Sequence, residues 1–160
     1  MEEGKIPLDS NTIDLLVMIR VSHHLIEPGP TFKEINRILK TNGLAIIEIA
    51  NHAHIINRLK YYVHFRKLPL KPVRIGRAAN GISDDIPFVN HNPHTIESSF
   101  KQNNMHIVKV LSVSNLRNRS IKKILGLNLT LIFEKRFQGI LAKILFGPSI
   151  FYLVRKTGNS

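Results

Sequence analysis

The N-terminal part of the chain reads as a strand, an amphipathic helix and a second strand. Residues 13–21 (IDLLVMIRV) are apolar at almost every position, which is typical of a parallel strand covered by helices on both faces. Apolar residues recur at helical spacing over residues 30–40 and predict a helix with one buried face. Residues 44–50 (LAIIEIA) form a second short apolar run. We therefore expect a βαβ unit with a right-handed crossover.

Residues at both ends of the predicted helix indicate where it begins and where it ends. Pro30 suits a first helical turn, because the N–H that proline lacks would be unpaired there. Asn42-Gly43 supplies the left-handed residue that commonly stops a helix. We expect the helix to run from Pro30 to about Lys40, with the second strand directly after the stop.

The rest of the chain predicts further helices and strands around an irregular insert. The predicted elements are a basic helix near 55–65, an irregular loop over 68–87, a short extended segment, a helix opening near Pro93 or His94, a strand over 106–116, a long basic helix over 121–146 broken near Gly126, and a final strand over 149–156. We interpret 1–160 as one α/β domain. Its parts are a βαβ core (1–54), a basic helix-and-loop insert (55–87) and C-terminal helices and strands (88–160).

Composition narrows the class of protein. The chain has 160 residues, 43% of them hydrophobic, which is enough for one buried core. It has no cysteine, which excludes disulfides and cysteine-ligated zinc. The N-terminus lacks the layout of a secretory signal, and no apolar run reaches the roughly 18 residues of a membrane span. We expect a soluble, cytoplasmic protein.

The charge is strongly positive and unevenly placed. The formal net charge is +12, and no acidic residue occurs between Glu48 and Asp84, a stretch that holds Arg58, Lys60, Arg66, Lys67, Lys71, Arg74 and Arg77. A solvated basic surface explains this pattern, and so does a platform for polyanions. A non-catalytic basic module that binds nucleic acid or an anionic membrane surface is therefore the alternative function.

Polar side chains follow both predicted strands. Arg20 and His24 come at the end of the first strand, and Asn51 and His52 follow the second. Because ligands of open parallel sheets bind at the carboxyl ends of the strands, we expect both groups at one binding rim. No glycine-rich phosphate loop accompanies them. A strand covered on both faces also needs a neighbour at each edge, and we find no segment before residue 13 to provide one.

The segment from Lys5 to Asn51 resembles the second half of a class I S-adenosylmethionine-dependent methyltransferase domain of the type-eleven group. The elements that carry the resemblance follow the family's order and separations: Ile6-Pro7-Leu8, Ile13-Asp14, Ser22-His23-His24 and the helix EINRILKTNG (34–43). Thr41-Asn42-Gly43 replaces the family's Pro-Gly-Gly at the helix stop. The later elements match the family's sixth and seventh strands more loosely.

The resemblance implies a partial Rossmann-like sheet, strands four to seven, with flanking helices and a helical insert before the last strand. It implies S-adenosylmethionine as methyl donor, with Ile6 beside the adenine and with Arg20 and Val21 near the methyl-bearing side. Simple packing of Ile6 and a carboxylate partner for Arg20 are the structural alternatives. The family's glycine-rich cofactor loop would lie upstream of Ile6. We therefore expect a C-terminal piece that alone binds the cofactor weakly or not at all, or a half that a partner chain completes.

The candidates on the acceptor side are His24, Asn51, His52 and His91. A histidine that titrates near neutrality can take a proton from a nucleophile, although the sequence assigns no catalytic residue. Adjacent residues such as His23 and His24 do not point the same way, and no zinc-site spacing accompanies them, so we expect no metal. The expected acceptor is a small or lipid-like molecule. The helix over 121–146 docks on the domain or rests on an anionic membrane surface.

Overall fold

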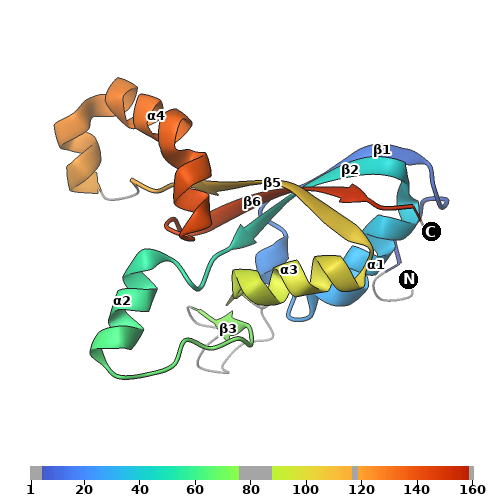
Figure 1. Cartoon of the computed structure of the whole chain (residues 1–160), viewed down its shortest axis with the longest axis horizontal. Coiled ribbons are helices and arrows are strands. Elements are labelled where there is room, and N and C mark those ends of the chain that lie inside the picture. Colours follow the sequence, from blue (N-terminus) through green and yellow to red (C-terminus); the bar gives the residue numbers. More distant parts are fainter. Residues whose placement is uncertain (1–4, 76–87, 117–118, 159–160) are drawn as a thin grey trace.

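A computed structural model describes residues 5–75, 88–116 and 119–158. Its larger sheet has the order β1-β2-β6-β5, from strands β1 (Ile13–Met18), β2 (Leu39–Ala50), β6 (Ser149–Lys156) and β5 (Met105–Val113). The β1 and β2 strands are parallel, whereas β6 runs antiparallel to both β2 and β5. This is the mixed α/β sheet with flanking helices that the sequence predicts (Figure 1).

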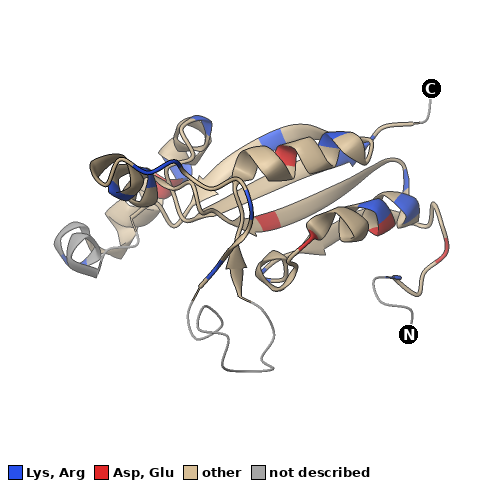
Figure 2. Ribbon diagram, turned by 90° about the horizontal axis from the view of Figure 1, so that it is seen from below, with Lys and Arg blue, Asp and Glu red and all other residues tan. Residues whose placement is uncertain are grey.

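Two helices cover one face of the sheet and build the core. They are α1 (Pro28–Ile38) and α3 (Pro93–Gln102), which lie side by side in Figure 2. Phe32 of α1 stacks on Phe100 of α3 with ring centroids 4.6 Å apart, and Phe100 meets Tyr152 of β6 edge-on at 5.3 Å. All three side chains are fully buried. Such contacts between large aromatic rings anchor the helices to the sheet.

The prediction that residues 13–21 form a strand buried on both faces is wrong in extent and in burial. The strand ends at Met18, and Arg20 turns the chain away with φ 58°. The strand lies at the edge of the described sheet, and the side chains of Leu15 and Val17 are 53% and 55% exposed. Only the face toward α1 is covered by described residues, which explains the exposure of the other face.

The predicted end of the first helix is also wrong. The α1 helix stops at Ile38, because Leu39 is already extended and pairs with Ile13. Thr41-Asn42-Gly43 therefore forms a bulge within β2, opposite the irregularity between Ile13 and Leu15. Asn42 does adopt the left-handed conformation, with φ 64°. The tertiary pairing of Leu39 ends the helix before the sequence signal does.

The remaining elements follow the sequence more closely. The structure has a short 3₁₀ turn η1 (Ser22–His24), helix α2 (Ile55–Val63), a two-stranded ladder of β3 (Val73–Arg74) and β4 (Val89–Asn90), and helix α4 (Arg119–Lys143). The predicted break in α4 is confirmed, because Gly126 has non-helical angles of φ 71° and ψ 170°. Within the predicted loop over 68–87, Val73–Arg74 instead form β3, because they pair with β4. Residues 76–87 of that loop lie outside the described residues.

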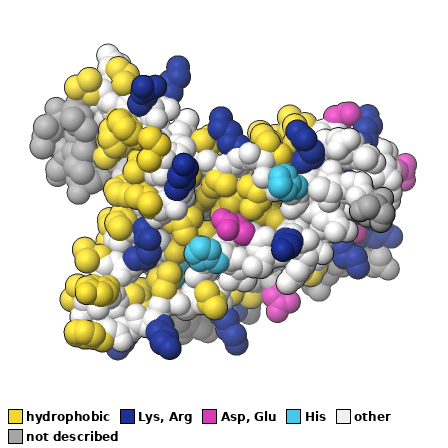
Figure 3. Space-filling model, viewed as in Figure 1, with side chains coloured by type: hydrophobic (Ala, Val, Ile, Leu, Met, Phe, Trp, Pro, Cys, Tyr) yellow, Lys and Arg dark blue, Asp and Glu magenta, His cyan; other side chains and the backbone are white. Residues whose placement is uncertain are grey.

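The α2 and α4 helices extend from one end of the sheet, at the left of Figure 1. Hydrophobic side chains gather on their surfaces, with Lys and Arg side chains between them (Figure 3). In the described part of the chain, no helix is long and apolar enough to cross a membrane.

Candidate functional site

The turn after β1 is fastened to β2 by one acidic side chain. The backbone N–H of Arg20 donates to Oε2 of Glu48 at 3.0 Å, and Oε1 of Glu48 accepts from the Ser149 hydroxyl at 3.0 Å. The Ser22 hydroxyl donates to the Glu48 carbonyl at 2.7 Å. Glu48 is the single acid in LAIIEIA, which is the signal that could have revealed this role. These bonds place the residues after β1 beside the end of β2.

Asn51 holds the end of β2 to the loop before β6. Its side-chain amide donates to the carbonyls of Leu145 at 3.0 Å and Gly147 at 2.7 Å, and its oxygen accepts from the N–H of Ala53 at 2.8 Å. The residue is 1% exposed. Because its amide is committed to the backbone, Asn51 shapes the rim rather than reaching toward a ligand.

His91 joins the segment before α3 to the same rim. Its backbone N–H donates to Ala50, its carbonyl accepts from the N–H of His52, each at 2.8 Å, and its Nε2 lies 3.1 Å from the Ser22 carbonyl. Burial lowers the pKa of His91, while its backbone hydrogen bonds oppose that shift. A neutral imidazole that donates from Nε2 to Ser22 fits this position. His91 therefore ties the η1 turn to the end of β2.

His52 is the buried rim histidine with an unused ring nitrogen. It is 6% exposed, and its Nε2 lies 3.3 Å from the Tyr61 hydroxyl. Its Nδ1 is buried and has no hydrogen-bond partner among the described residues. Burial lowers the pKa of His52, so the ring is neutral near pH 7. A buried polar atom without a partner is uncommon in proteins and calls for an explanation.

His52 forms the inner wall of a pocket of about 540 Å³ beneath α2. The pocket is lined by His52, Asn57, Lys60, Tyr61, His64, Arg66 and Val73. Its lining carries basic side chains and no acidic one, so it favours a ligand with negative charge. Tyr61, which reaches His52 from α2, was missed by the sequence analysis because nothing in a helical pattern marks it.

The predicted cofactor residues lie on two different parts of the fold. Arg20 and Val21 are exposed at the rim, and Arg20 meets a carboxylate, Glu48, through its backbone N–H. His24 lies close by in η1, where its ring meets the ring of Phe88 edge-on at 5.2 Å. Arg20, Val21 and His24 therefore lie in the turn after β1, and Asn51 and His52 lie directly after β2.

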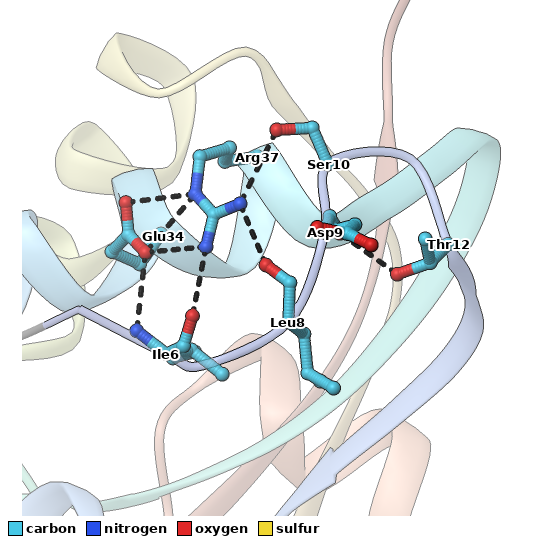
Figure 4. Close-up of polar contacts among 7 residues, drawn as sticks. All are labelled: Ile6, Leu8, Asp9, Ser10, Thr12, Glu34 and Arg37. Carbon is cyan, nitrogen blue, oxygen red and sulfur yellow. Dashed lines mark hydrogen bonds and ion pairs between the residues drawn. The ribbon is translucent and has the colours of Figure 1, made fainter.

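Ile6 lies in the N-terminal segment, and its backbone is clamped by α1 (Figure 4). Its N–H donates to Oε2 of Glu34 at 3.2 Å, and its carbonyl accepts from Nη2 of Arg37 at 2.9 Å. The hydrogen bond from Arg37 lowers the pKa of Glu34. The Ile6 side chain is partly buried against the core, which agrees with the packing alternative.

A metal site does not emerge from the part of the chain that the structure describes. No group of three or more His, Cys, Asp or Glu side chains gathers there in a way that could hold an ion.

The fold matches solved methyltransferases. It aligns with an S-adenosylmethionine-dependent methyltransferase from Mesorhizobium loti at a TM-score of 0.57 and 10% identity, covering 95% of this chain and 65% of that one. It aligns with a complex of the Haloferax volcanii Trm112 methyltransferase activator and a protein described as a methyltransferase at a TM-score of 0.55 and 13% identity, covering 98% and 59%. Residues 1–47 match the family model of a methyltransferase domain.

The chain has a class I S-adenosylmethionine-dependent methyltransferase fold. The sheet order β1-β2-β6-β5 assigns β1 and β2 to the fourth and fifth strands of this methyltransferase fold, and β5 and β6 to the sixth and seventh. A third match is a geranyl diphosphate C-methyltransferase from Streptomyces coelicolor A3(2), solved with Mg²⁺, geranyl diphosphate and S-adenosyl-L-homocysteine. It has a TM-score of 0.50 and 11% identity, covering 96% of this chain and 50% of that one.

The methyltransferase fold described here spans 50% to 65% of the length of these three solved chains. No curated protein matches the sequence.

Proposed function

We propose that the chain contributes the acceptor side of an S-adenosylmethionine-dependent methyltransferase. The observation that carries the proposal is the joining of the β1 and β2 ends into one rim, beside a pocket whose inner wall is His52. In open parallel sheets this end of the strands is where ligands bind. When bound, S-adenosylmethionine supplies an electrophilic methyl group on a sulfonium. A cytoplasmic location is part of this proposal.

The residues of this chain fit one side of the cofactor. Ile19 and Val21, which flank Arg20, are 47% and 44% exposed and offer an apolar wall at the rim. Arg20 and Val21 would face the methyl-bearing side, as the resemblance implies. Ile6 would contribute packing. The remaining contacts to the cofactor would come from residues outside this chain or from a partner chain along the open edge of β1.

The acceptor would enter the pocket under α2. His52 would meet the nucleophile, because its ring is neutral and its Nδ1 has no other described partner. With Nε2–H donating to the Tyr61 oxygen, Nδ1 keeps a lone pair that can accept the proton of a hydroxyl or amine. Because Nδ1 is buried, the His52 ring would have to turn toward the pocket for this step. Lys60 and Arg66 at the pocket favour a small-molecule acceptor that carries an anionic group. His24 and His91 would shape the rim from the other side.

Two measurements test this proposal. The protein would be purified from its own cells together with any chain that it carries, and incubated with methyl-tritiated S-adenosylmethionine and a small-molecule extract. We expect label in the small-molecule fraction and its loss with His52→Phe. His106→Phe, an exposed histidine of β5, is the matched control and should transfer as well as the wild type. Absence of label in every fraction would contradict the proposal.

The second measurement is a calorimetric titration of the isolated chain with S-adenosylmethionine. Because the described residues form only one wall of the cofactor site, we expect weak binding or none. A dissociation constant in the micromolar range would contradict the idea that further residues complete the site.

The comparisons give no support to the alternative of a non-catalytic basic module. The same fold is found in solved S-adenosylmethionine-dependent methyltransferases, and the basic residues match no recognised nucleic-acid-binding motif. Any contact with a membrane therefore has to be argued from the surface of this fold itself.

A further inference from the structure

The α2 helix exposes an apolar face that no described residue covers. None of its residues is buried. Ile56, Leu59, Tyr62 and Val63 are 60% to 78% exposed, and Phe65, directly after the helix, is 99% exposed. A large apolar side chain in full contact with water is energetically unfavourable, because apolar surface is more stable when it is removed from water. A cluster of such residues marks an interaction surface.

The α4 helix exposes a second apolar surface at the same end of the molecule (Figure 3). Its exposed large apolar side chains are Leu127, Leu129, Leu131, Ile132, Phe137 and Ile140. The start of α2 is bonded to the segment directly after α4: the N–H of Ile55 donates to the Phe146 carbonyl at 3.1 Å, and the Arg58 guanidinium donates to the Ile144 carbonyl. The two apolar faces therefore belong to one end of the fold.

Basic side chains are interleaved with these apolar residues. Lys60, Arg66 and Lys67 lie on or directly after α2 and are exposed, and no acid occurs between Glu48 and Asp84. Lys135 and Arg136 are exposed on α4. The acid of α4, Glu134, is turned inward, where it accepts from the Asn115 amide at 2.7 Å and from the Leu116 N–H at 3.0 Å. Among the described residues of α2 and α4, the exposed charge is therefore positive.

We infer that α2 and α4 together form a docking surface for an anionic lipid bilayer. Helices that combine exposed aliphatic and aromatic residues with Lys and Arg lie in the membrane interface, with the apolar side chains inserted and the cations at the lipid headgroups. The positive charge of this surface decides between a membrane and other binding partners. A second copy of the same face would bring like charges together on a protein of net charge +12. Nucleic acid would match the cations but leave Ile56, Leu59 and Leu127 in water.

The inference is independent of methyl transfer, because it rests on a surface outside the rim. The pocket beneath α2 adjoins this surface, because Lys60 and Arg66 belong both to the pocket and to the docking surface. An amphipathic acceptor could therefore pass from the bilayer into the pocket.

The test is binding of the full chain to vesicles of phosphatidylcholine alone and of phosphatidylcholine with phosphatidylglycerol. We expect binding to the anionic vesicles only, weakened by salt. The double variant Tyr62→Ser with Phe65→Ser should bind roughly tenfold more weakly, since two interfacial aromatic anchors are lost. The control is Leu8→Ser with Val108→Ser, which replaces two exposed apolar residues elsewhere and should bind like the wild type.

A fluorescence measurement reports insertion directly. The sequence has no tryptophan, so Phe65→Trp provides a single reporter whose emission should shift to the blue on anionic vesicles. Leu8→Trp should show no shift. Wild-type binding that the Tyr62/Phe65 double variant leaves unchanged would overturn the inference. So would failure of Phe65→Trp to shift, or light scattering showing that the double variant turns a dimer into a monomer.

Discussion

At the scale of single residues, hydrogen bonding separates the buried histidines into two kinds. The ring of His91 uses its Nε2 to bond Ser22 of η1, while its backbone groups bond Ala50 and His52 at the end of β2. The ring of His52 uses only Nε2, toward Tyr61, and keeps a buried Nδ1 without a described partner. The sequence shows both as histidines near strand ends and cannot tell them apart. Only the fold distinguishes the structural imidazole from the one suited to meet a ligand.

The lowered histidine pKa values predict a loss of stability in acid. Burial lowers the pKa of His91 in the folded chain below its ordinary value of 6.5, so the unfolded chain takes up the proton first as the pH falls. The stabilisation is fully present above about pH 6.5 and is lost between there and the lower folded pKa. The free energy of unfolding, measured by denaturant titration, should therefore fall as the pH drops below about 6.5.

A variant distinguishes the contribution of His91 to this pH dependence from that of the other histidines. His91→Gln keeps an amide that can donate to Ser22 but cannot titrate, so its stability should depend less on pH. His106→Gln, at an exposed site on β5, should keep the wild-type dependence. An unchanged slope in the His91 variant would show that the acid sensitivity arises elsewhere, for example at His52, whose pKa burial also lowers.

At the scale of elements, local patterns predict what local forces determine. The α3 helix, with Ile96 and Phe100 on its buried edge, the break of α4 at Gly126 and the final strand β6 are all confirmed. The prediction fails where pairing between distant residues decides, as at Leu39, which joins β2 instead of extending α1. The same holds for the site: the rim position of Asn51 follows from its place after a strand, but its bonds to Leu145 and Gly147 depend on the loop before β6.

The bulge in β2 predicts that replacing Gly43 by alanine, which adds one methyl group, lowers the stability of the fold. A Cβ on Gly43 would lie 2.8 Å from the Lys40 carbonyl oxygen and 3.1 Å from that of Ile13. Because both neighbours are backbone atoms, relief requires the bulge within β2 to change shape and β1 to move away. Gly43→Ala should lower the free energy of unfolding by about 1–3 kcal/mol.

The control for this change lies in a helix. Gly139 in α4 has nothing within 4 Å of an added Cβ, so Gly139→Ala should stabilise the chain by up to about 1 kcal/mol through helix propensity. Denaturant titration of both variants measures the two effects. Equal stabilities for Gly43→Ala and the wild type would show that the bulge relaxes freely.

At the scale of the whole molecule, the described sheet is closed on one face and open on the other. The α1 and α3 helices cover the face that holds Ile47, Ile49 and Tyr152. Along the open edge, Leu15, Val17 and Ile19 remain about half exposed. An apolar edge strand with unpaired backbone groups is a template for another strand. The methyltransferase proposal and this open edge therefore both favour a further strand that pairs with β1.

The two edges of the sheet differ in how well they resist pairing. The β5 edge carries Lys109 beside a register irregularity between Ile107 and Lys109, and both features discourage the addition of a strand. The β1 strand carries one charge near its start, Asp14, which pairs with Lys40, and none from Leu15 to Met18. When the chain is purified alone, we expect it to associate through β1, so that its mass by light scattering rises with concentration.

A single lysine should abolish that association. Val17→Lys places a charge on the β1 edge at a side chain that is 55% exposed, so the fold tolerates it while a second strand is repelled. Val108→Lys makes the same change on β5, where the side chain is 43% exposed, and should leave the association intact. The same rise in mass for Val17→Lys and the wild type would show that β1 does not mediate association. A wild type that stays monomeric at every concentration would show the same. The companion strand would then have to be held by contacts other than β1.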